Sequence, residues 1–380
     1  MSTDWLIVGS GFTGAVLAER IASQLNQTVL IVEKRDHIGG NAFDEFDHHG
    51  ILVHRYGPHI FHTNSLKVWN YLSQFTEWHP YYHRVLAIVE GRPIPIPFNL
   101  NSIEQLFPIR LAEQLQTKLI SHFGFGTKIP ILRMKEVSDS DIQFLADYVY
   151  QNIFYHYTTK QWGLKPEDLD ASVTARVPIY ISRDDRYFQD TYQAMPKHGY
   201  TRLFQRMLSH PNIRILLKTD YREISDMIKY HRMVYTGPID EFFDYKYGKL
   251  PYRSLRFQFE HYQVAQYQPV GQMNYPNDYQ YTRITEFKHL TGQQHHATTV
   301  AFEFPVEHRT GENEPYYPIP SSVNRELFAK YRAEADALPT TIFAGRLADY
   351  QYYNMDQAIA RALKIFDTLR AAGTPIIINR

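Results

Sequence analysis

The segment from Trp5 to Glu33 constrains the fold of this chain more than any other feature. An apolar run, Trp5–Val8, leads into a turn with the pattern Gly9-x-Gly11-x-x-Gly14. Apolar residues at helical spacing follow, and a second apolar run ends at Glu33, which predicts a strand, a helix and a second strand. In such a unit a pyrophosphate approaches the glycines at the helix N-terminus, and an acidic residue about 20 positions later binds ribose hydroxyls. We therefore predict a dinucleotide-binding βαβ unit.

Composition excludes several classes of protein. Lys plus Arg number 40 and Asp plus Glu number 40, so no global charge favours nucleic acid or an anionic membrane. The absence of cysteine excludes disulfides, thiolate metal sites and a redox-active dithiol. No apolar run approaches the ~18 residues of a membrane span, and the N-terminus with Asp4 does not resemble a signal peptide. We expect a cytoplasmic protein without a membrane span.

Hydrophobic periodicity predicts the other elements of secondary structure. Helices are predicted over 102–123 and 138–155, and a polar loop over 161–172. Strands are predicted within 211–224 and 231–240, in "SLRFQFEHY", "YQYTRITEF" and "ATTVAFEF" between 250 and 305, and at 340–345. A last helix is predicted to bury Ile359, Leu363, Phe366 and Leu369 on one face.

The residues after Glu33 favour FAD over NAD as the cofactor. The chain continues "KRDHIGGNA", where Gly39 and Gly40 permit close approach of the backbone to a second part of the cofactor. This continuation, together with "MVYTGPID" (233–240) and "IFAGR" (342–346), resembles the FAD-binding superfamily that includes amine oxidases. Each pattern is weak alone, but three in the expected order favour FAD.

The predicted fold is α/β, with a Rossmann-like FAD-binding domain interrupted by a helical insert domain and an antiparallel β-sheet domain. Residues 1–85, 195–245 and 338–380 are assigned to the FAD-binding domain. Residues 100–190 are assigned to the helical domain, which carries a mobile substrate lid, and residues 86–99 and 246–337 to the sheet domain.

Longer motifs extend over essentially the whole chain and are far more specific than the glycine turn. They are "RYGPHIFHT" (55–63), "YTTKQWG" (157–163), "SVTARVP" (172–178), "RDDRYFQDTYQAMPKHGYT" (183–201), "YTRITEFKH" (281–289), "PYYPIP" (315–320) and "GRLADYQYYNMDQAI" (345–359). Together they resemble the bacterial UDP-galactopyranose mutases. The resemblance implies an isomerase that interconverts UDP-galactopyranose and UDP-galactofuranose with no net redox change. It also implies that reduced FAD attacks the anomeric carbon through N5, and that the sugar ring opens and recloses through a flavin–sugar iminium.

The resemblance also implies a set of substrate-binding residues. Arg176 and Arg283 match the cations that stabilise charge on the departing diphosphate, a task that suits the guanidinium fork. Trp162 matches a residue of the lid, which we expect in an exposed loop. The other matched positions are Phe154 and Tyr157 at the uracil, Asn274 in the sugar-nucleotide cleft, and the diphosphate-contacting Tyr187, Tyr317 and Tyr352. Tyr316 is an alternative to Tyr317 as the inward-facing tyrosine.

The cofactor-binding positions are assigned from the glycine turn and the same resemblance. They are Gly9, Gly11, Phe12, Thr13, Gly14, Glu33, Lys34, Gly40, Asn41, His59, Arg346, Tyr352, Met355 and Asp356. His59 is expected beside the isoalloxazine as a catalytic residue that steadies reduced flavin, without a general-base role. Asp356 is alternatively a simple helix-start carboxylate. No metal site is predicted, because His59 and His62 have no third ligand nearby.

One position departs from the pattern of some family members. Asn354 stands where they carry an aspartate, so it is assigned only a polar positioning role and a helix cap. The resemblance further implies an external reductant such as NAD(P)H and a homodimer. The alternative functions are a flavin-dependent oxidase or dehydrogenase of the amine-oxidase type, and a non-catalytic nucleotide-sugar or flavin-binding protein.

Overall fold

The computed structural model describes residues 2–166, 169 and 178–372. The chain separates into two compact units. The first unit comprises Met1–Pro80, Asp190–Tyr252 and Val323–Arg380, and the second comprises Tyr81–Gln189 and Arg253–Ser322. Residues 86–189 and 253–322, predicted as parts of separate helical and sheet domains, belong together to the second unit, whereas residues 246–252 and 323–337 of the predicted sheet domain belong to the first. The division into a helical and a sheet domain stays a prediction.

A five-stranded parallel sheet in the order β12-β2-β1-β13-β19 forms the centre of the first unit. Its strands are Ser2–Val8 (β1), Val29–Val32 (β2), Ile213–Leu216 (β12), Lys229–Tyr235 (β13) and Thr341–Phe343 (β19). Every residue of β2 is buried, as expected for a parallel strand covered on both faces. Because the strands are parallel, the turns that follow β1, β2, β13 and β19 all lie at one edge.

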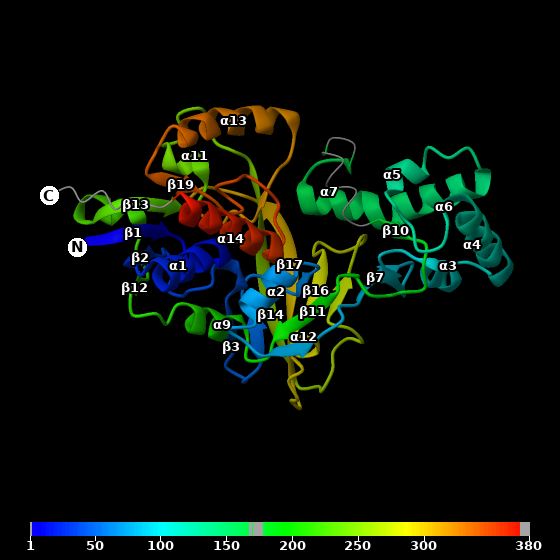
Figure 1. Cartoon of the computed structure of the whole chain (residues 1–380). Helices are drawn as coiled ribbons and strands as arrows, with labels where there is room; N and C mark the ends of the chain where they lie inside the picture. The colour runs from blue at the N-terminus through cyan, green and yellow to red at the C-terminus, as the bar shows by residue number, and fades with distance from the viewer. Residues whose placement is uncertain (1, 167–168, 170–177, 373–380) are drawn as a thin grey trace. The chain divides into compact units, whose positions relative to one another are not determined.

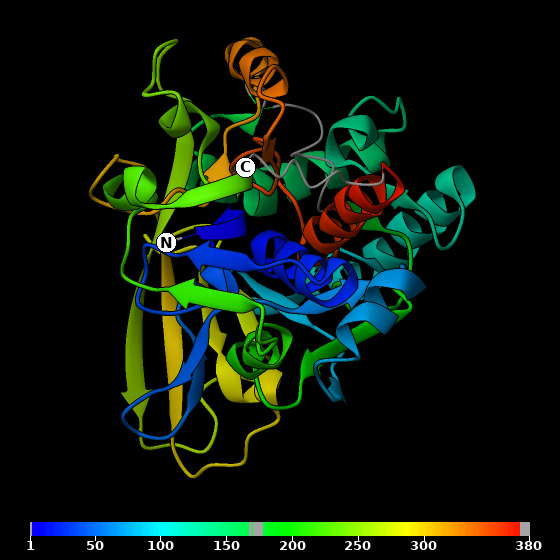
Figure 2. The ribbon, with the colours of Figure 1, turned by 60° about the vertical axis from the view of Figure 1, so that its left-hand side comes forward.

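Two long helices of the first unit, α1 (Phe12–Leu25) and α14 (Met355–Ala371), lie side by side (Figures 1 and 2). The predicted face of α14 is correct, because Ile359, Leu363 and Phe366 are buried. The remaining elements are β3 (Asp44–Phe46), β4 (Leu52–His54), β5 (Phe61–Thr63), α2 (Leu66–Leu72), β6 (Trp78–Pro80), β11 (Tyr192–Pro196), α9 (Tyr200–Met207), α10 (Tyr221–Ile224), α11 (Ile239–Phe242), α13 (Ser322–Asp336) and the short turns η1 (Gly40–Ala42) and η4 (Ser225–Met227).

A seven-stranded sheet in the order β18-β14-β17-β16-β15-β7-β8 forms one part of the second unit. The strands are Val85–Val89 (β7), Arg92–Ile96 (β8), Tyr252–Tyr262 (β14), Gln272–Asn274 (β15), Arg283–Glu286 (β16), Thr298–Glu307 (β17) and Tyr317–Pro318 (β18). The pairs β14–β17, β17–β16, β16–β15 and β7–β8 are antiparallel, as predicted, and β15 pairs with β7 in parallel.

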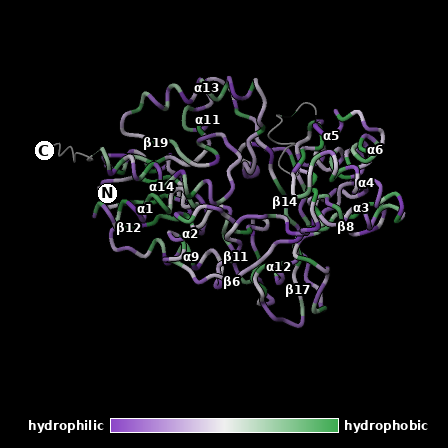
Figure 3. The backbone as a smooth tube through the Cα atoms, turned by 45° about the vertical axis from the view of Figure 1, so that its right-hand side comes forward, coloured by the Kyte–Doolittle hydropathy of each residue, from purple (hydrophilic) through white to green (hydrophobic). Residues whose placement is uncertain are grey.

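Several helices of the second unit share one hydrophobic core with strands β7 and β8. They are α3 (Leu100–Leu106), α4 (Ile109–Phe123), α5 (Ile131–Met134), α6 (Ser140–Val149) and the π-helical turn η2 (Tyr150–Tyr155), with a small pair of strands, β9 (Lys128–Ile129) and β10 (Ile179–Tyr180). This unit also contains α7 (His156–Trp162) and α12 (Phe287–Thr291). Hydrophobic and hydrophilic residues alternate along α4 and α6 (Figure 3). The apolar faces, with Leu115, Leu119 and Leu145, fill this core.

Several predicted boundaries are wrong for local reasons. The helix predicted over 102–123 is two helices, because Pro108 forces Phe107 into an extended conformation between α3 and α4. The strand predicted over 211–224 ends at Leu216, since Asp220 caps the short helix α10. The strand predicted for "YQYTRITEF" shrinks to Arg283–Glu286. Within the described ranges, no helix combines the length and apolar character that a bilayer crossing requires.

Candidate functional site

Two of the three glycines in the turn of the first unit have no room for a side chain. Gly9 has a φ of 98°, which favours glycine, and a Cβ there would lie 2.2 Å from Thr236 Oγ1. A Cβ on Gly14 would lie 2.0 Å from the Gly9 carbonyl oxygen. Gly11 is different, because the nearest atom to its Cβ would be the Gly40 Cα at 3.9 Å. Gly9 and Gly14 are therefore required by the fold itself, whereas Gly11 leaves space above the start of α1.

The start of α1 is suited to an anion. Its N-cap is Gly11, which has no side chain to cap the first backbone N–H groups, and the first turn carries no acidic residue. These N–H groups and the helix dipole form a site for a phosphate. The predicted residues Phe12 and Thr13 begin this helix with buried side chains. Phe12 packs on Phe204, with ring centroids 4.7 Å apart, so only its backbone faces the turn.

Glu33 lies immediately after β2 and reaches the glycine turn. Its Oε2 accepts hydrogen bonds from the backbone N–H of Ser10 at 2.9 Å and from Ser10 Oγ at 2.7 Å. Its Oε1 accepts from the backbone N–H of Arg35 at 3.1 Å. The predicted ribose-binding carboxylate therefore also fixes the conformation of the turn.

The second glycine pair lies against the first. A Cβ on Gly40 would come within 3.0 Å of the Gly11 Cα, and Gly40 has a φ of 57°, so this position favours glycine. Asn41 Oδ1 accepts a hydrogen bond from Arg35 at 3.0 Å, which fixes the amide beside Gly40. Gly345 meets the turn from the other side, because its Cβ would lie 3.2 Å from Thr13 Oγ1. Segments distant in the sequence thus converge on the start of α1, as the sequence predicts.

His59 is held in one tautomer. Its Nδ1 is 2.8 Å from the Gly57 carbonyl oxygen, which can only accept, so Nδ1 carries the hydrogen and Nε2 is left as an acceptor. Burial, with His54 and Arg346 nearby, lowers the pKa of His59 to about 3. The imidazole is therefore neutral near pH 7 and can accept a hydrogen bond.

The other predicted cofactor residues also belong to the first unit. Lys34 follows Glu33 and is exposed, while Tyr352 is half-buried. Met355 and Asp356 are the first two residues of α14, and Asp356 Oδ2 accepts a hydrogen bond from Thr63 at 3.0 Å. Asn354 is the N-cap of α14, as predicted, and forms a capping box in which Gln357 Oε1 accepts from its backbone N–H at 2.9 Å.

The second unit presents a row of three polar residues across neighbouring strands. Asn274 on β15 is directly opposite Arg283 on β16, and Arg283 is opposite Glu303 on β17. Residues directly opposite in an antiparallel sheet share a face. Arg283 Nε lies 3.1 Å from Glu303 Oε1, and the Glu303 side chain is 3% exposed. Burial opposes the charge on Arg283, but Glu303 and neighbouring tyrosines outweigh it and hold its pKa above the usual value.

Tyrosines surround this arginine. The Arg283 guanidinium donates from Nη2 to the Tyr157 hydroxyl at 2.9 Å. Tyr187 and Tyr317 are close enough for their hydroxyls to influence its charge. Tyr316 is instead buried against Phe257, with centroids 6.1 Å apart, so Tyr317 rather than Tyr316 faces Arg283. Four predicted substrate residues of the second unit are thus brought together.

Three further predicted substrate residues are Phe154, just before α7, Trp162, at its end, and Arg176. Trp162 is the last residue of α7 and is 8% exposed, so the expectation of an exposed loop tryptophan is wrong. Its ring packs near Tyr317, with centroids 6.1 Å apart. Phe154 lies in the π-helical turn and packs against the helical core. Arg176 lies outside the described residues, and its role stays a prediction.

Sequence reasoning missed three residues that build these sites. Glu303 fixes Arg283, Ser10 links the turn to Glu33, and Thr236 supports the end of β1 through its Oγ1, which donates to the Val8 carbonyl at 2.8 Å. A carboxylate inside the apolar strand "ATTVAFEF" is the one signal that indicates a buried partner. Ser10 and Thr236 are ordinary turn residues and give no such signal.

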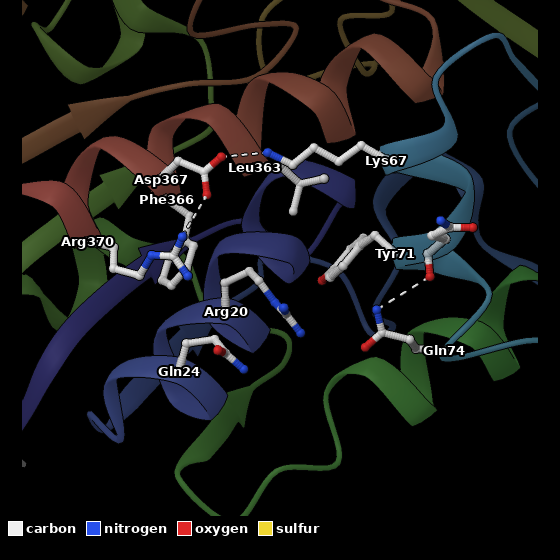
Figure 4. Close-up of a pocket in the computed structure, with 10 residues that line it drawn as sticks. Arg20, Gln24, Lys67, Tyr71, Gln74, Leu363, Phe366, Asp367 and Arg370 are labelled. Carbon is white, nitrogen blue, oxygen red and sulfur yellow. Dashed lines mark hydrogen bonds and ion pairs between the residues drawn. The ribbon is translucent and has the colours of Figure 1, made fainter.

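A shallow pocket on the helices of the first unit does not coincide with the glycine turn. It has a volume of about 310 Å³ and lies between α1, α2 and α14 (Figure 4). Its cations are paired, with Lys67 2.5 Å from Asp367 and Arg370 3.9 Å from the same carboxylate. On α1 the pocket is lined by Arg20 and Gln24, near the end of the helix opposite the turn. We assign it no part in the candidate site. Among the described residues, no three His, Asp or Glu side chains are grouped as metal ligands.

Comparisons with known proteins agree with this geometry. A family model described as UDP-galactopyranose mutase matches residues 152–352, and one described as an NAD(P)-binding Rossmann-like domain matches residues 7–75. A probable UDP-galactopyranose mutase of Klebsiella pneumoniae is 40% identical over 365 residues, covering 95% of this chain and 93% of the relative. A dTDP-fucopyranose mutase of Escherichia coli is 37% identical over 366 residues, covering 94% and 96%. A crystal structure of reduced UDP-galactopyranose mutase has a TM-score of 0.74 at 15% identity, covering 99% and 95%, and shares the fold.

Proposed function

The chain belongs to the UDP-galactopyranose mutase family, and we propose that it interconverts UDP-galactopyranose and UDP-galactofuranose with reduced FAD and no net oxidation. One observation carries the proposal. Arg283, fixed by Glu303 and Tyr157, forms a cationic and hydroxyl-rich cluster in a chain that also contains a FAD-type turn. An amine or alcohol oxidase shares the turn but needs no cluster for a diphosphate.

The residues at the glycine turn fit FAD. Gly11 and Gly40 form a cradle that a side chain would fill, and the uncapped start of α1 can hold the pyrophosphate. We assign Glu33 to the ribose by its position at the end of β2, and the Nε2 of His59 would accept a hydrogen bond from the reduced flavin. When bound and reduced, FAD supplies an electron-rich flavin nitrogen as the nucleophile for the anomeric carbon.

The second unit supports the departure and return of UDP. Negative charge develops on the diphosphate as the anomeric C–O bond breaks, and preorganised donors stabilise that charge. Arg283 is such a donor, because it forms an ion pair with Glu303 across the strands and its Nη2 donates to the Tyr157 hydroxyl. Tyr187 and Tyr317 add hydroxyl donors beside it, and we assign Asn274, opposite Arg283 on β15, a polar contact with the sugar nucleotide. We keep Arg176 as the second cation of the site by family resemblance.

In the proposed reaction the flavin must be reduced before turnover, although the isomerisation itself consumes no electrons. We propose an external reductant such as NAD(P)H, because a chain without cysteine has no dithiol of its own to reduce the flavin. We further propose a cytoplasmic homodimer, and this part rests on the family resemblance alone.

The proposal is tested with the purified protein reduced by dithionite and supplied with UDP-galactofuranose. We expect UDP-galactopyranose to form with the reduced protein and not with the same protein after oxidation. Turnover that is equal in both states, or absent in the reduced state, would refute the mutase assignment. An oxidase would instead show flavin reduction by the substrate. A parallel assay with dTDP-fucopyranose measures the nucleotide preference, because a mutase for that sugar is almost as similar to this chain.

A further inference from the structure

Lys160 lies inside a ring of backbone carbonyl groups. It is on α7, between Tyr157 and Trp162, and its ammonium reaches the loop that joins β15 to β16. The Nζ atom is 2.5 Å from the carbonyl oxygen of Tyr275, 2.9 Å from that of Tyr279, 3.3 Å from that of Asn277 and 3.4 Å from that of Tyr281. An ammonium has three donors, so the lysine is fully occupied by this one loop.

This arrangement is costly for a charged group. Among the described residues, no ion pair is found for Lys160, and its one acidic influence is the charge of Asp278, which raises its pKa without a hydrogen bond. Burial lowers the pKa of Lys160 to about 8. A buried cation without a carboxylate is unfavourable unless its hydrogen bonds fix something that the molecule needs.

The loop that Lys160 holds connects two of the predicted substrate residues. Asn274 is the last residue of β15, and Arg283 is the first residue of β16. The loop closes through the Tyr275 N–H, which donates to the Thr282 carbonyl at 2.8 Å. One end of α7 meets the same hairpin, because the Tyr157 hydroxyl is bonded to Arg283. Lys160 therefore ties the loop to the helix that carries the tyrosine partner of Arg283.

A second cation holds the opposite side of α7. Arg253 on β14 donates to the carbonyl of Gln161 at 3.1 Å and to that of Lys160 at 3.3 Å, at the C-terminus of the helix. Gly163 is needed beside it, because a Cβ there would lie 3.0 Å from Arg253 Nη1. With one end of α7 fixed to β14, the contact of Lys160 sets how the β15–β16 loop lies against the helix.

We propose that Lys160 is a positioning residue of the substrate site, which holds the β15–β16 loop against α7 so that Arg283 and Tyr157 stay in register. It acts through the backbone of residues 275–281 and does not contact the reacting atoms. The identity of the bound nucleotide rests on the proposed function, but the positioning role does not.

The first test measures hydrogen exchange in the holoprotein without substrate. Lys160→Met removes the ammonium and keeps the length of the side chain. We expect amide exchange in residues 275–282 and in α7 to become faster by roughly tenfold or more, because the loop loses its contacts with the ammonium and keeps the bond from the Asn277 amide to the Asn152 carbonyl. Lys288→Met is the matched control, since Lys288 is 9% exposed and donates to the carbonyls of Ala265 and His295, both at 2.6 Å.

The control should speed exchange near residues 265 and 295 but leave residues 275–282 unchanged. Unchanged exchange in that loop of Lys160→Met, or the same acceleration there in Lys288→Met, would overturn the proposal. Lys160→Arg keeps the charge but cannot converge on four carbonyls with a planar fork, so it provides a milder variant if Lys160→Met does not fold. The expected acceleration in the loop is smaller in Lys160→Arg but still measurable, and its absence would also count against the role.

The second test measures binding of UDP to the oxidised holoprotein by calorimetry. We expect the Kd to rise about tenfold in Lys160→Met, as for contacts within one network, and to stay within twofold in Lys288→Met. An unchanged Kd in Lys160→Met would overturn the link to the substrate site. If the wild-type protein bound no UDP, the proposed function would fail, while the exchange data would still decide whether Lys160 positions the loop.

Discussion

The two units of this chain build their sites from different materials. The first unit uses backbone, because glycines and the uncapped start of α1 form a cradle into which few side chains project. The second unit uses side chains, because Arg283 is aligned by Glu303 on the next strand and by Tyr157 on a helix. Most of the backbone site lies between Gly9 and Gly40, with Thr236 and Gly345 added from later segments, and short sequence patterns indicate it. In the side-chain site, Tyr157 and Arg283 are more than a hundred positions apart and no local pattern joins them.

The electrostatics of the two sites differ as well. In the first unit, His54 is buried and His59 is half-buried, and both are neutral near pH 7, with the pKa of His54 lowered to about 4 by burial. In the second unit, Arg283 and Glu303 form a charged pair in which each partner offsets the burial of the other. The first arrangement is sensitive to acid, and the second is sensitive to the loss of one partner. Four predictions follow this contrast.

The largest effect is expected at Arg283. Arg283→Lys keeps the positive charge, but an ammonium on a flexible stem cannot contact Glu303 and Tyr157 in the geometry of the fork. We expect kcat/KM to fall about 10²- to 10³-fold, as for loss of one preorganised donor, while FAD content stays unchanged. Steady-state kinetics with the reduced enzyme measure the effect. Arg256→Lys, in which the exposed Arg256 lies over Phe304 on the same sheet, is the control. A fall in kcat/KM of less than threefold in Arg283→Lys would contradict the claim that the site of the second unit depends on the geometry of this side chain.

Gly11→Ala tests the backbone cradle. The added methyl meets only the Gly40 Cα at 3.9 Å, so the fold accepts it, but it occupies the space that we assign to the pyrophosphate. We expect FAD affinity to fall about 10- to 100-fold, as for lost hydrogen bonds to a charged group, with no change in the melting temperature of the apoprotein.

The comparison variant for this test is Gly14→Ala. Its methyl would lie 2.0 Å from the Gly9 carbonyl oxygen, so it should destabilise the apoprotein itself. Fluorescence titration with FAD and thermal unfolding separate the two outcomes. Full FAD affinity in Gly11→Ala would exclude this turn as the cofactor site.

Acid should act through both His54 and His59, and His54 can be tested alone. A histidine whose folded pKa is below its unfolded value contributes stability that is present above about pH 6.5 and is lost as the pH falls toward the folded value. With His54 1% exposed and its pKa at about 4, the free energy of unfolding should fall by about 1.5 kcal/mol between pH 6.5 and pH 5 through this residue.

Urea unfolding of wild type and His54→Gln at both pH values measures this loss. The variant should lack that part of the pH dependence. It is also less stable at pH 6.5 if the glutamine does not accept the hydrogen bond that the His59 backbone N–H donates to His54 Nδ1. An identical pH dependence in the two proteins would show that His54 is not the acid-sensitive group.

The smallest effect is expected at Asn354, where some relatives carry an aspartate. Because Asn354 is the N-cap of α14, Asn354→Ala should cost about 1 kcal/mol of stability, whereas Asn354→Asp should retain the cap. Thermal unfolding measures both variants, and their kinetics show whether the carboxylate adds activity. Equal stability of wild type and Asn354→Ala would remove the capping role.

The sequence predicts the first unit better than the second for a physical reason. The turn, the βαβ order, Glu33 and the amphipathic α14 are local patterns, and each is found where it is expected. The row of Asn274, Arg283 and Glu303 depends on the register of three strands, which periodicity alone does not fix. Family resemblance identifies Asn274 and Arg283, but the pairing of Arg283 with Glu303 is found only in the folded structure.

Other differences come from contacts between segments distant in the sequence. Trp162 was expected in an exposed loop, yet α7 extends to it because Arg253 holds the last carbonyls of the helix. The strand expected at "YQYTRITEF" begins only at Arg283, because the preceding carbonyls turn toward Lys160. In the sequence, Arg253 and Lys160 are ordinary basic residues, and no pattern indicates that either one contacts backbone carbonyls.

The most direct test of the central claim follows the oxygen that joins galactose to the diphosphate. UDP-galactopyranose labelled with oxygen-18 at this bridging position is incubated with the reduced protein, and the position of the label is read by phosphorus NMR. If UDP departs and returns in the site around Arg283, the label should scramble into the non-bridging positions of the β-phosphate. The oxidised protein should leave it in place. Interconversion of the two sugar rings with the label still bridging would contradict the account.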